Sequence, residues 1–328
     1  MTDMNASIVI VLATRNGSEF LAKQLDSLLL QTESRWNLLI RDDCSTDETQ
    51  SIIQEYQKKT DQIQVLTDDR SACSSALGNF SILLEAAYEH GAGYIFCCDQ
   101  DDVWEPDKLE LLVARLKQLE GKGGAPCLVH HDLTVVDKSL EPVAASFVEL
   151  MQLQPSNQSN PQRLLSRNEV TGCAMAFNRT LLEIALPVSG HAVMHDWWLA
   201  LCAGYFGHLD FVSDKLVKYR QHGENVIGAK SFWHALNPFT NWIAGWRRGD
   251  EDFIDSVKQA RAFRDAMADR FDRSSEAFES LDSFCKLLTA SRWQRLKALR
   301  NCGLWRTHWV LNVVMVLRML LLPRASER

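Results

Sequence analysis

Residues 93–106 read GYIFCCDQDDVWEP and place three aspartates within four positions, directly after an apolar run. The apolar run has the composition of a buried strand, and Pro106 is typical of the first turn of a helix. Asp99, Asp101 and Asp102 therefore follow the end of a strand, where three like charges repel one another unless a cation is present. The stretch predicts a strand, a charged turn and a helix in succession.

The same alternation extends outward from this stretch over the first hundred residues. Strand patterns cover residues 7–13, 36–43 and 63–69, and helical spacing covers residues 18–31, 47–59 and 78–91. Strands that alternate with helices indicate crossover connections and a mostly parallel sheet. We therefore expect an α/β protein with a Rossmann-like, doubly wound sheet, whose ligands bind beyond the carboxyl ends of the strands.

Each predicted strand in this region ends in polar residues. They are Thr14, Arg15 and Asn16 after the first strand, Arg41, Asp42 and Asp43 after the second, Asp68, Asp69 and Arg70 after the third, and the three aspartates after the fourth. Loops are often polar, and STDE at 45–48 is also a capping-box pattern that explains Ser45 and Glu48 by helix capping alone. Four polar strand ends on one edge nevertheless favour a binding site.

The Asp-Gln-Asp sequence at 99–101 predicts a divalent metal site. Mg²⁺ and Mn²⁺ are held in proteins by one or two carboxylates together with the phosphate oxygens of a substrate. A lone Asp-x-Asp is weak evidence, but its place after a strand and before a helix strengthens the interpretation. The sequence thus indicates a site for Mg²⁺ or Mn²⁺ and a diphosphate.

Seven blocks of the chain, in order, carry a resemblance to a known family. They are IVLATRNGSEFLAKQLDSLLLQT, LLIRDDCSTDET, GNFSILLEAA, YIFCCDQDDVWEPDKL, VTGCAMAFNR, HDWWLAL and YRQHGENVIG. In order and spacing they resemble family 2 glycosyltransferases with the GT-A fold, and most closely the bacterial rhamnosyltransferase-like branch that assembles surface polysaccharides such as O-antigen. The resemblance covers roughly residues 7–228.

The resemblance implies an inverting, metal-dependent glycosyltransferase that moves rhamnose or a similar sugar from a nucleoside diphosphate donor, dTDP-rhamnose or a UDP-sugar, to a growing glycan or a lipid-linked acceptor. No nucleic-acid partner is expected. The residues that it implies for donor binding are Thr14, Arg15, Asn16, Asp42, Asp43, Asp69, Asn79, Asp99 and Arg220.

The resemblance also implies the metal ligands and the base. Asp101 would bind the cation, with Asp99 and His222 as further contacts, and Asp196 would deprotonate the acceptor hydroxyl. Displacing a diphosphate from an anomeric carbon needs charge stabilisation on one side and a base on the other. Asp196 also fits a helix N-cap, and His222 an ordinary loop histidine.

Two departures from the family pattern concern the donor. Many relatives have Pro and Tyr where this chain has Ala13 and Thr14, and Gly where it has Cys44. These differences affect the donor details and leave the fold prediction unchanged.

The C-terminal region differs from the rest. We expect a catalytic domain over residues 1–229 and a helical region over residues 230–328, which holds six of the ten tryptophans. Residues 292–328 carry eight basic residues and one acidic residue, so this segment has a charge of +7 and the remainder −14. Such a segment fits an anionic membrane interface.

The most apolar stretch, 309–323, is too short to span a bilayer as a helix, at about 22 Å. We therefore expect either an interfacial helix or a helix packed on the protein or on a second subunit. The nine cysteines are scattered, and the N-terminus lacks a basic segment before its apolar run. Both features favour a reduced, cytoplasmic chain, peripheral to the cytoplasmic face of the inner membrane.

Two other functions remain open at this point. One is a non-catalytic scaffold that binds nucleotide sugars. The other is a phosphotransferase with an aspartyl nucleophile, although such sites usually follow the first strand and have a Thr or Val pattern that DQDDVW lacks.

Overall fold

The computed structural model describes residues 7–67, 74–155, 161–222, 242–302, 304–305 and 309–322. Contacts between Cα atoms divide the chain into two compact units. The first comprises Met1–Ser159, Val170–Val188 and Met194–Gly228, and the second comprises Asn160–Glu169, Ser189–Val193 and Ala229–Arg328. The expected domain boundary at 229/230 stays a prediction.

The first unit is built on one mixed sheet of nine described strands. The strands are β1 (Ile8–Thr14), β2 (Trp36–Asp42), β3 (Ile63–Val65), β4 (Tyr94–Cys98), β5 (Val103–Trp104), β6 (Cys127–Val136), β7 (Pro142–Ala144), β8 (Met175–Asn178) and β9 (His208–Arg220). Their order is β3-β2-β1-β4-β8-β6-β9-β5, and β7 pairs with β6.

Most of these strands run in one direction. β1 to β4 pair in parallel, and β6 pairs in parallel with β9. β8 is antiparallel to both β4 and β6, so β4 and β6 point the same way. The predicted α/β fold with a mostly parallel sheet is thus confirmed, and the chain from 208 to 220, which reads as separate strands or a hairpin, is a single long strand.

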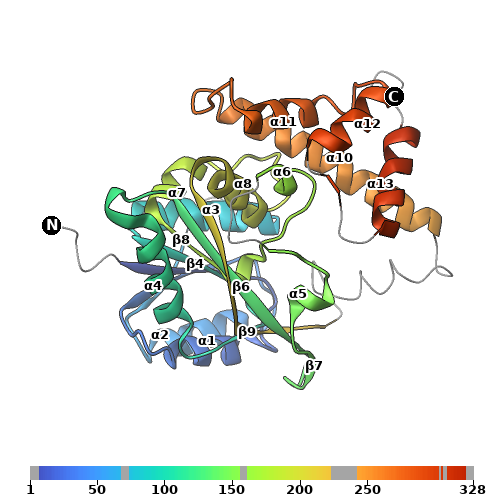
Figure 1. Ribbon diagram of the computed structural model, residues 1–328. Coiled ribbons are helices and arrows are strands. Elements are labelled where there is room, and N and C mark those ends of the chain that lie inside the picture. Colours follow the sequence, from blue (N-terminus) through green and yellow to red (C-terminus); the bar gives the residue numbers. More distant parts are fainter. Residues whose placement is uncertain are drawn as a thin grey trace. The chain divides into compact units, whose positions relative to one another are not determined.

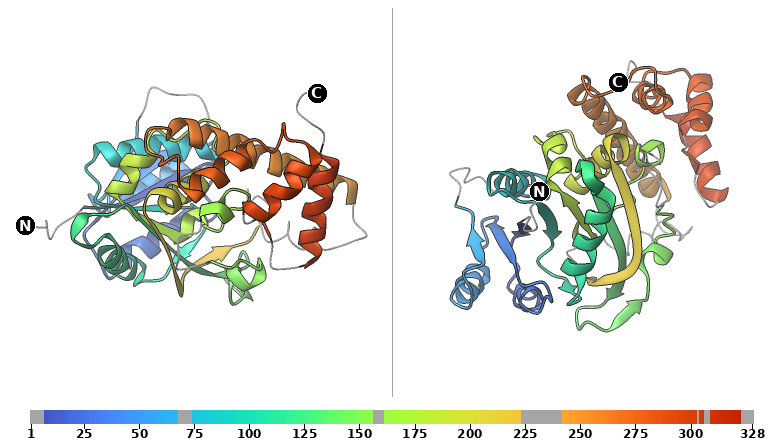
Figure 2. Two further views of the ribbon diagram at one scale, coloured as in Figure 1. Left: turned by 45° about the horizontal axis from the view of Figure 1, so that its top comes forward. Right: turned by 60° about the vertical axis from the view of Figure 1, so that its left-hand side comes forward.

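Helices cover both faces of the sheet (Figure 1 and Figure 2). They are α1 (Leu21–Leu29), α2 (Thr49–Gln57), α3 (Ala76–Glu89), α4 (Lys108–Glu120), α5 (Phe147–Leu150), α7 (Arg179–Ala185) and α8 (His195–Phe206), with 3₁₀ turns η1 (Gly121–Gly123) and η2 (Gly172–Ala174).

Alternation along β1 explains the two layers. Ile8, Ile10 and Leu12 join the core that α1, α2 and α4 cover, whereas Val9 and Val11 point to the opposite face, which α3 covers. All five side chains are buried. A strand buried on both faces reads as a continuous apolar run, and this is what residues 8–12 show.

The second unit contains helices in all of its described elements. They are α6 (Pro161–Leu164), α10 (Trp242–Ala266), α11 (Glu276–Cys285), α12 (Arg292–Asn301) and α13 (Trp309–Leu321). Their core holds Phe253, Phe263, Leu281 and Phe284, which are buried. The predicted helical C-terminal region is confirmed. Among the residues that the structure describes, no helix is both long and apolar enough to cross a membrane.

Candidate active site

The polar ends of β1, β2 and β4 meet at one edge of the sheet, because these three strands are parallel neighbours. Gln100, between the two aspartates of Asp-Gln-Asp, makes the connection. Its Oε1 accepts hydrogen bonds from the Thr14 hydroxyl at 2.6 Å and from the Arg15 N–H at 2.9 Å, and its Nε2 donates to the Arg15 carbonyl at 3.2 Å. Sequence reasoning missed this residue, since a spacer between two aspartates carries no signal of its own.

Position 17, beside Gln100 and Thr14, leaves little room for a side chain. A Cβ atom at Gly17 would lie 2.5 Å from Gln100 Oε1 and 2.8 Å from Thr14 Oγ1, closer than real Cβ atoms approach. The Gly17 N–H donates to Thr49 Oγ1 at 2.8 Å, at the start of α2. The close approach of these side chains therefore fixes the turn after β1.

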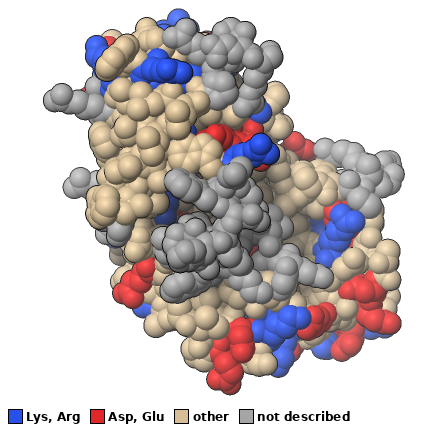
Figure 3. Space-filling model, turned by 90° about the vertical axis from the view of Figure 1, so that its right-hand side faces the viewer, with Lys and Arg blue, Asp and Glu red and all other residues tan. Residues whose placement is uncertain are grey.

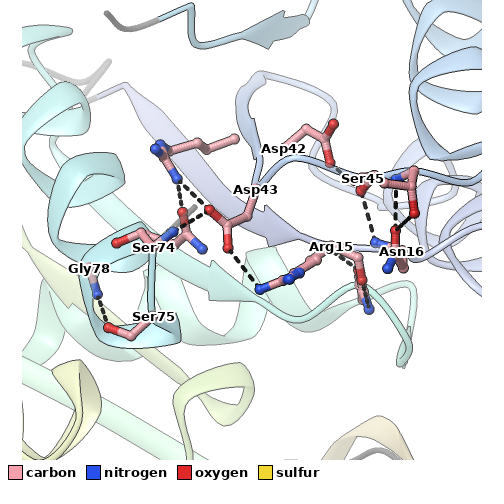
Figure 4. Close-up of polar contacts among 12 residues, drawn as sticks. Arg15, Asn16, Asp42, Asp43, Ser45, Ser74, Ser75 and Gly78 are labelled. Atoms are coloured by element: carbon pink, nitrogen blue, oxygen red, sulfur yellow. Dashed lines mark hydrogen bonds and ion pairs between the residues drawn. The ribbon is translucent and has the colours of Figure 1, made fainter. Parts of the chain in front are cut away.

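Asp43 is the centre of a buried polar network at the end of β2 (Figure 4). Its Oδ1 accepts the Ser74 N–H at 2.7 Å and lies 3.3 Å from Arg41 Nη1, and its Oδ2 lies 3.8 Å from Arg15 Nη1. Arg41 also donates to Asn79 Oδ1. Asp43 and Asn79, both expected near the donor, are thus held together inside the protein, and Asp43 ties residue 74 to the sheet.

Asn16 and Asp42 are linked through Ser45. The Ser45 hydroxyl accepts the Asn16 N–H at 2.8 Å and donates to Asp42 Oδ1. Ser45 therefore does not cap α2, whose N-cap position is Glu48 without a side-chain cap hydrogen bond. The capping-box interpretation is wrong, because α2 begins after Glu48 and the Ser45 hydroxyl bonds to Asn16 and Asp42 instead of to the backbone N–H of Glu48. Asp69 lies outside the described residues.

The backbone at 44 explains one departure from the family pattern. Cys44 has a φ of +60°, in the left-handed region that favours glycine. This backbone conformation accounts for the glycine that many relatives have here, and the cysteine of this chain is exposed at that position.

The three aspartates after β4 have different surroundings. Asp101 Oδ2 lies 2.6 Å from His222 Nε2, and both side chains are largely buried. Asp102 is fully buried, and its Oδ1 accepts the Arg220 N–H at 3.0 Å. The Arg220 guanidinium donates from Nε to the Asp101 carbonyl at 2.7 Å. The turn is therefore fastened to the end of β9.

Asp99 belongs to the interior of this turn. One oxygen from each of Asp99 and Asp102 lies within 4.8 Å of the other and of Cys173 Sγ. Burial, together with the neighbouring Asp101 and Asp196 carboxylates, raises the pKa of Asp99 to about 7. Burial and the neighbouring Asp101 and Asp99 carboxylates raise the pKa of Asp102 well above its usual range. Three carboxylates close together in one turn favour the binding of a positive charge.

The predicted metal ligands have the chemistry that a divalent cation needs. Asp99 and Asp101 offer the carboxylate oxygens that Mg²⁺ prefers, and His222 offers an imidazole nitrogen that Mn²⁺ also accepts. In the structure Asp101 is paired with His222, whereas Asp99 is grouped with Asp102 and Cys173. Cys173 is not suited to either ion, because burial and the adjacent Asp102 and Asp99 keep the pKa of its thiol well above the usual range.

Asp196 lies in the first turn of α8, and only 6% of its surface is exposed. Its Oδ1 accepts the Trp197 N–H at 2.6 Å. Gly172 lies against it, since a Cβ atom there would be 3.6 Å from Asp196 Oδ2. The charge of Asp196 is close enough to Asp99 to contribute to its raised pKa. The first turn of α8 and the charged turn after β4 therefore lie close together.

The comparisons with known proteins agree with this arrangement. The sequence profile of "Glycosyl transferase family 2" matches residues 9–183, more than half of the chain. The WcaA protein of Escherichia coli (strain K12), named as a colanic acid biosynthesis glycosyl transferase, is 31% identical over 265 residues, which cover 79% of this chain and 87% of WcaA. The chain belongs to glycosyl transferase family 2.

Two other relatives match over smaller shares of both chains. The dTDP-rhamnosyl transferase RfbG of Shigella flexneri is 27% identical over 66% of this chain and 74% of its own. TuaG of Bacillus subtilis (strain 168), named for teichuronic acid biosynthesis, is 31% identical over 37% of this chain, which spans only 43% of TuaG.

Solved structures share the fold at low identity. S. aureus TarS in complex with UDP-GlcNAc has a TM-score of 0.52 at 12% identity, covering 90% of this chain and 89% of TarS 1-349. The mannosyltransferase PcManGT from Pyrobaculum calidifontis, in complex with GDP-Man and Mn²⁺, has a TM-score of 0.51 at 16% identity, covering 95% and 80%. The GT-A fold expected from the sequence is thereby confirmed.

Proposed function

We propose that the chain is an inverting glycosyltransferase that moves a sugar from a nucleoside diphosphate donor to a growing cell-surface glycan or lipid-linked acceptor. The observation that supports the proposal is the position of Asp99, which follows β4 and lies close enough to the carboxylates of Asp101 and Asp196 for both to raise its pKa, while Asp101 is paired with His222. A diphosphate bound beside Asp101 and a base at Asp196 would then both be near Asp99.

The donor nucleotide is proposed to bind where β1 and β2 end. Exposed Arg15 and half-buried Asp42 offer charged groups to a base and ribose, while buried Asp43, Arg41 and Asn79 hold the backbone behind them. The names of relatives and neighbours mention dTDP-rhamnose-type, UDP-GlcNAc and GDP-Man ligands, which supports a nucleotide-sugar donor. A dTDP-rhamnose or UDP-sugar donor remains our proposal for this chain.

A divalent cation at Asp99, Asp101 and His222 would neutralise charge on the leaving diphosphate. Asp101 is already oriented by His222, with Arg220 on its carbonyl. Burial lowers the pKa of Arg220, whose guanidinium is bound to backbone carbonyls of Asp101 and Lys138. Its proposed contribution is a positive charge behind the turn.

Asp196 is proposed to accept the proton of the acceptor hydroxyl as this oxygen attacks the anomeric carbon. The hydroxyl oxygen forms the new glycosidic bond, the bond to the diphosphate oxygen breaks, and the configuration inverts. Only one base is needed, because the diphosphate leaves without protonation when its charge is neutralised.

Asp196→Asn tests the assignment with little change in shape. We expect transfer to fall by about 10²–10⁴-fold, the contribution of a general base, while Mn²⁺-dependent binding of UDP, dTDP or GDP is retained. Glu183→Gln, an exposed carboxylate on α7, is the control and should leave transfer unchanged. Wild-type protein that binds a donor and never turns it over would instead be a scaffold.

We also propose that α13 contacts an anionic bilayer surface, where a lipid-linked acceptor would be found. Trp309, Val313, Leu317 and Leu321 are exposed, and their spacing of four residues places them along one side of the helix. Val310 and Leu311, in its first turn, are exposed as well. Arg318, which interrupts the apolar stretch in the sequence, is paired with Asp250 at 2.7 Å.

The opposite side of α13 is already covered within the second unit, because Met315 and Met319 are buried and α13 packs on α12. α13 therefore has one apolar side that packs internally and one that faces outward. In the space-filling view, the upper part of the face shown carries mostly residues other than Lys, Arg, Asp and Glu, with a few basic and a few acidic side chains among them (Figure 3). Apolar and basic groups together suit an anionic lipid surface.

Vesicle sedimentation tests this contact on the full chain. Wild-type protein should sediment with phosphatidylglycerol vesicles more than with phosphatidylcholine vesicles, and Val313→Glu with Leu317→Glu should abolish the difference. Leu111→Glu, at an exposed leucine of α4, is the matched control. Equal sedimentation of the double variant and the wild type would contradict the proposal.

A further inference from the structure

Lys108, the first residue of α4, is fully buried. Its Nζ donates to the Cys173 carbonyl at 2.6 Å and lies 3.5 Å from the centre of the Trp104 ring. Burial lowers the pKa of this amine to about 8, so its position in the interior is unfavourable for the charged form. Helix α4 does not need this burial, because the helix could form equally well with the Lys108 side chain exposed to solvent.

One contact of Lys108 leads to the metal turn. Trp104 is buried in β5, two residues after Asp102, and pairs with Val217 of β9. The same β9 ends at Arg220, whose N–H is bound to Asp102 Oδ1. The ring beneath the ammonium therefore belongs to the rigid segment that carries Asp101.

The other contact leads to the base. Cys173 follows Gly172 in η2, and a Cβ atom at Gly172 would lie 3.1 Å from His195 Nε2 and 3.6 Å from Asp196 Oδ2. The His195 ring is stacked on Phe80 at 3.8 Å with an interplanar angle of 20°. The first turn of α8 is thus held between Phe80 on one side and the backbone at 172 on the other.

We propose that Lys108 is a positioning residue that fixes the separation between the turn that carries Asp101 and the turn beneath Asp196. The inference rests on the proposed function, in which the leaving diphosphate and the attacking hydroxyl must lie in line on opposite sides of one anomeric carbon. Lys108 donates a hydrogen bond to the turn beneath Asp196 and packs on the segment that carries Asp101. One buried side chain therefore sets the distance between the proposed metal ligand and the proposed base.

Lys108→Met tests this by removing the hydrogen bond and the charge while keeping most of the volume. Dissociation constants of UDP, dTDP and GDP with Mn²⁺ should stay within about threefold of wild type, whereas kcat should fall by about 30-fold or more, because a base displaced by a fraction of an ångström loses its alignment. Lys117→Met, at an exposed position of the same helix, should change neither. Nucleotide binding that weakens as much as kcat falls, or an unchanged kcat, would overturn the proposal.

Gly172→Ala changes the turn that Lys108 contacts, instead of Lys108 itself, and adds only a methyl group. It should give the same result, a lower kcat with retained nucleotide binding, because the methyl would lie 3.1 Å from His195 Nε2 and push this residue, the neighbour of Asp196, away from the turn. Gly190→Ala, where an added Cβ has no neighbour within 4 Å, is the control. A Gly172→Ala protein with wild-type kcat would also count against the proposal.

Hydrogen exchange gives a readout that needs no turnover. Amides of residues 172–178 should exchange faster in Lys108→Met than in Lys117→Met, and equal exchange would contradict the connection. A wild-type chain that transfers no sugar would refute the proposed function, while the exchange measurement would still decide whether Lys108 holds the turn.

Discussion

The pair of Arg41 and Asp43 offers a quantitative test of how the nucleotide side of the site is held. The two residues are 5% and 2% exposed, and Arg41 Nη1 lies 3.3 Å from Asp43 Oδ1. Removing one partner of a buried ion pair typically costs about 3–5 kcal/mol, because the other charge remains buried without its counter-charge.

We expect Asp43→Asn and Arg41→Met each to lower the free energy of unfolding by about 3 kcal/mol, near the low end of that range. Asp43→Asn keeps an acceptor for the Ser74 N–H, and Arg41 keeps Asn79. The double variant leaves neither charge behind, so it should lose about 3–4 kcal/mol instead of the sum of about 6.

Urea unfolding of the four proteins of this cycle measures the coupling. The exposed pair of Lys59 and Glu55, four residues apart on α2 and the turn after it, is the control and should show a coupling of only about 0.3–0.5 kcal/mol. Losses that add within about 0.5 kcal/mol for Arg41 and Asp43 would refute the reasoning that their charges support one another.

Three further predictions concern other parts of the site. Cys44 is the one exposed thiol among the eight described cysteines, so maleimide should modify it before the other seven, and bound nucleotide should slow this; mass spectrometry of the digested protein reads both effects. Burial lowers the pKa of His195 to about 3. Below about pH 6.5 the unfolded state therefore binds a proton at this histidine that the folded state does not bind, and the free energy of unfolding falls as pH falls from about 6.5 towards 3. Between pH 7.5 and 5.5 His195→Phe should therefore lose about 1 kcal/mol less than wild type in urea unfolding, and equal losses would contradict the assignment. Gly17→Ala should push Gln100 away and lower the unfolding free energy by about 1–3 kcal/mol, whereas Gly190→Ala should have no such effect.

The alternation of apolar runs and helical spacing was sufficient to predict β1 to β4 and the helices between them, because each is a local pattern. The antiparallel course of β8 was not predictable in this way, since only its pairing with β4 and β6 defines it. The long strand β9 contains Asp214 and Lys215, which read as a turn. Its pairing with β6 shifts register there instead, and the strand continues.

The candidate site was predictable where polar residues follow strands. It was less predictable where a buried side chain supports the site from the protein interior. Asp101 and His222 lie 121 positions apart and are in contact, while their roles as metal ligands stay a prediction from the resemblance. Lys108 gave no signal, because a lysine in an amphipathic helix is expected to be exposed. The task of Asp102 was likewise invisible, since it depends on a backbone N–H at Arg220, at the end of a distant strand.

The hydrogen bonds by which Gln100 holds Thr14 and Arg15 bear on any attempt to redesign the specificity of this protein. A search pattern treats the middle position of Asp-Gln-Asp as interchangeable, yet here that amide closes β1 against β4 through three hydrogen bonds. Grafting the Asp-x-Asp motif of another enzyme onto this chain would keep the two carboxylates but would remove the hydrogen bonds made by Gln100, which lies between them in the sequence. A library for new donors should therefore keep residue 100 fixed and vary the exposed positions around it.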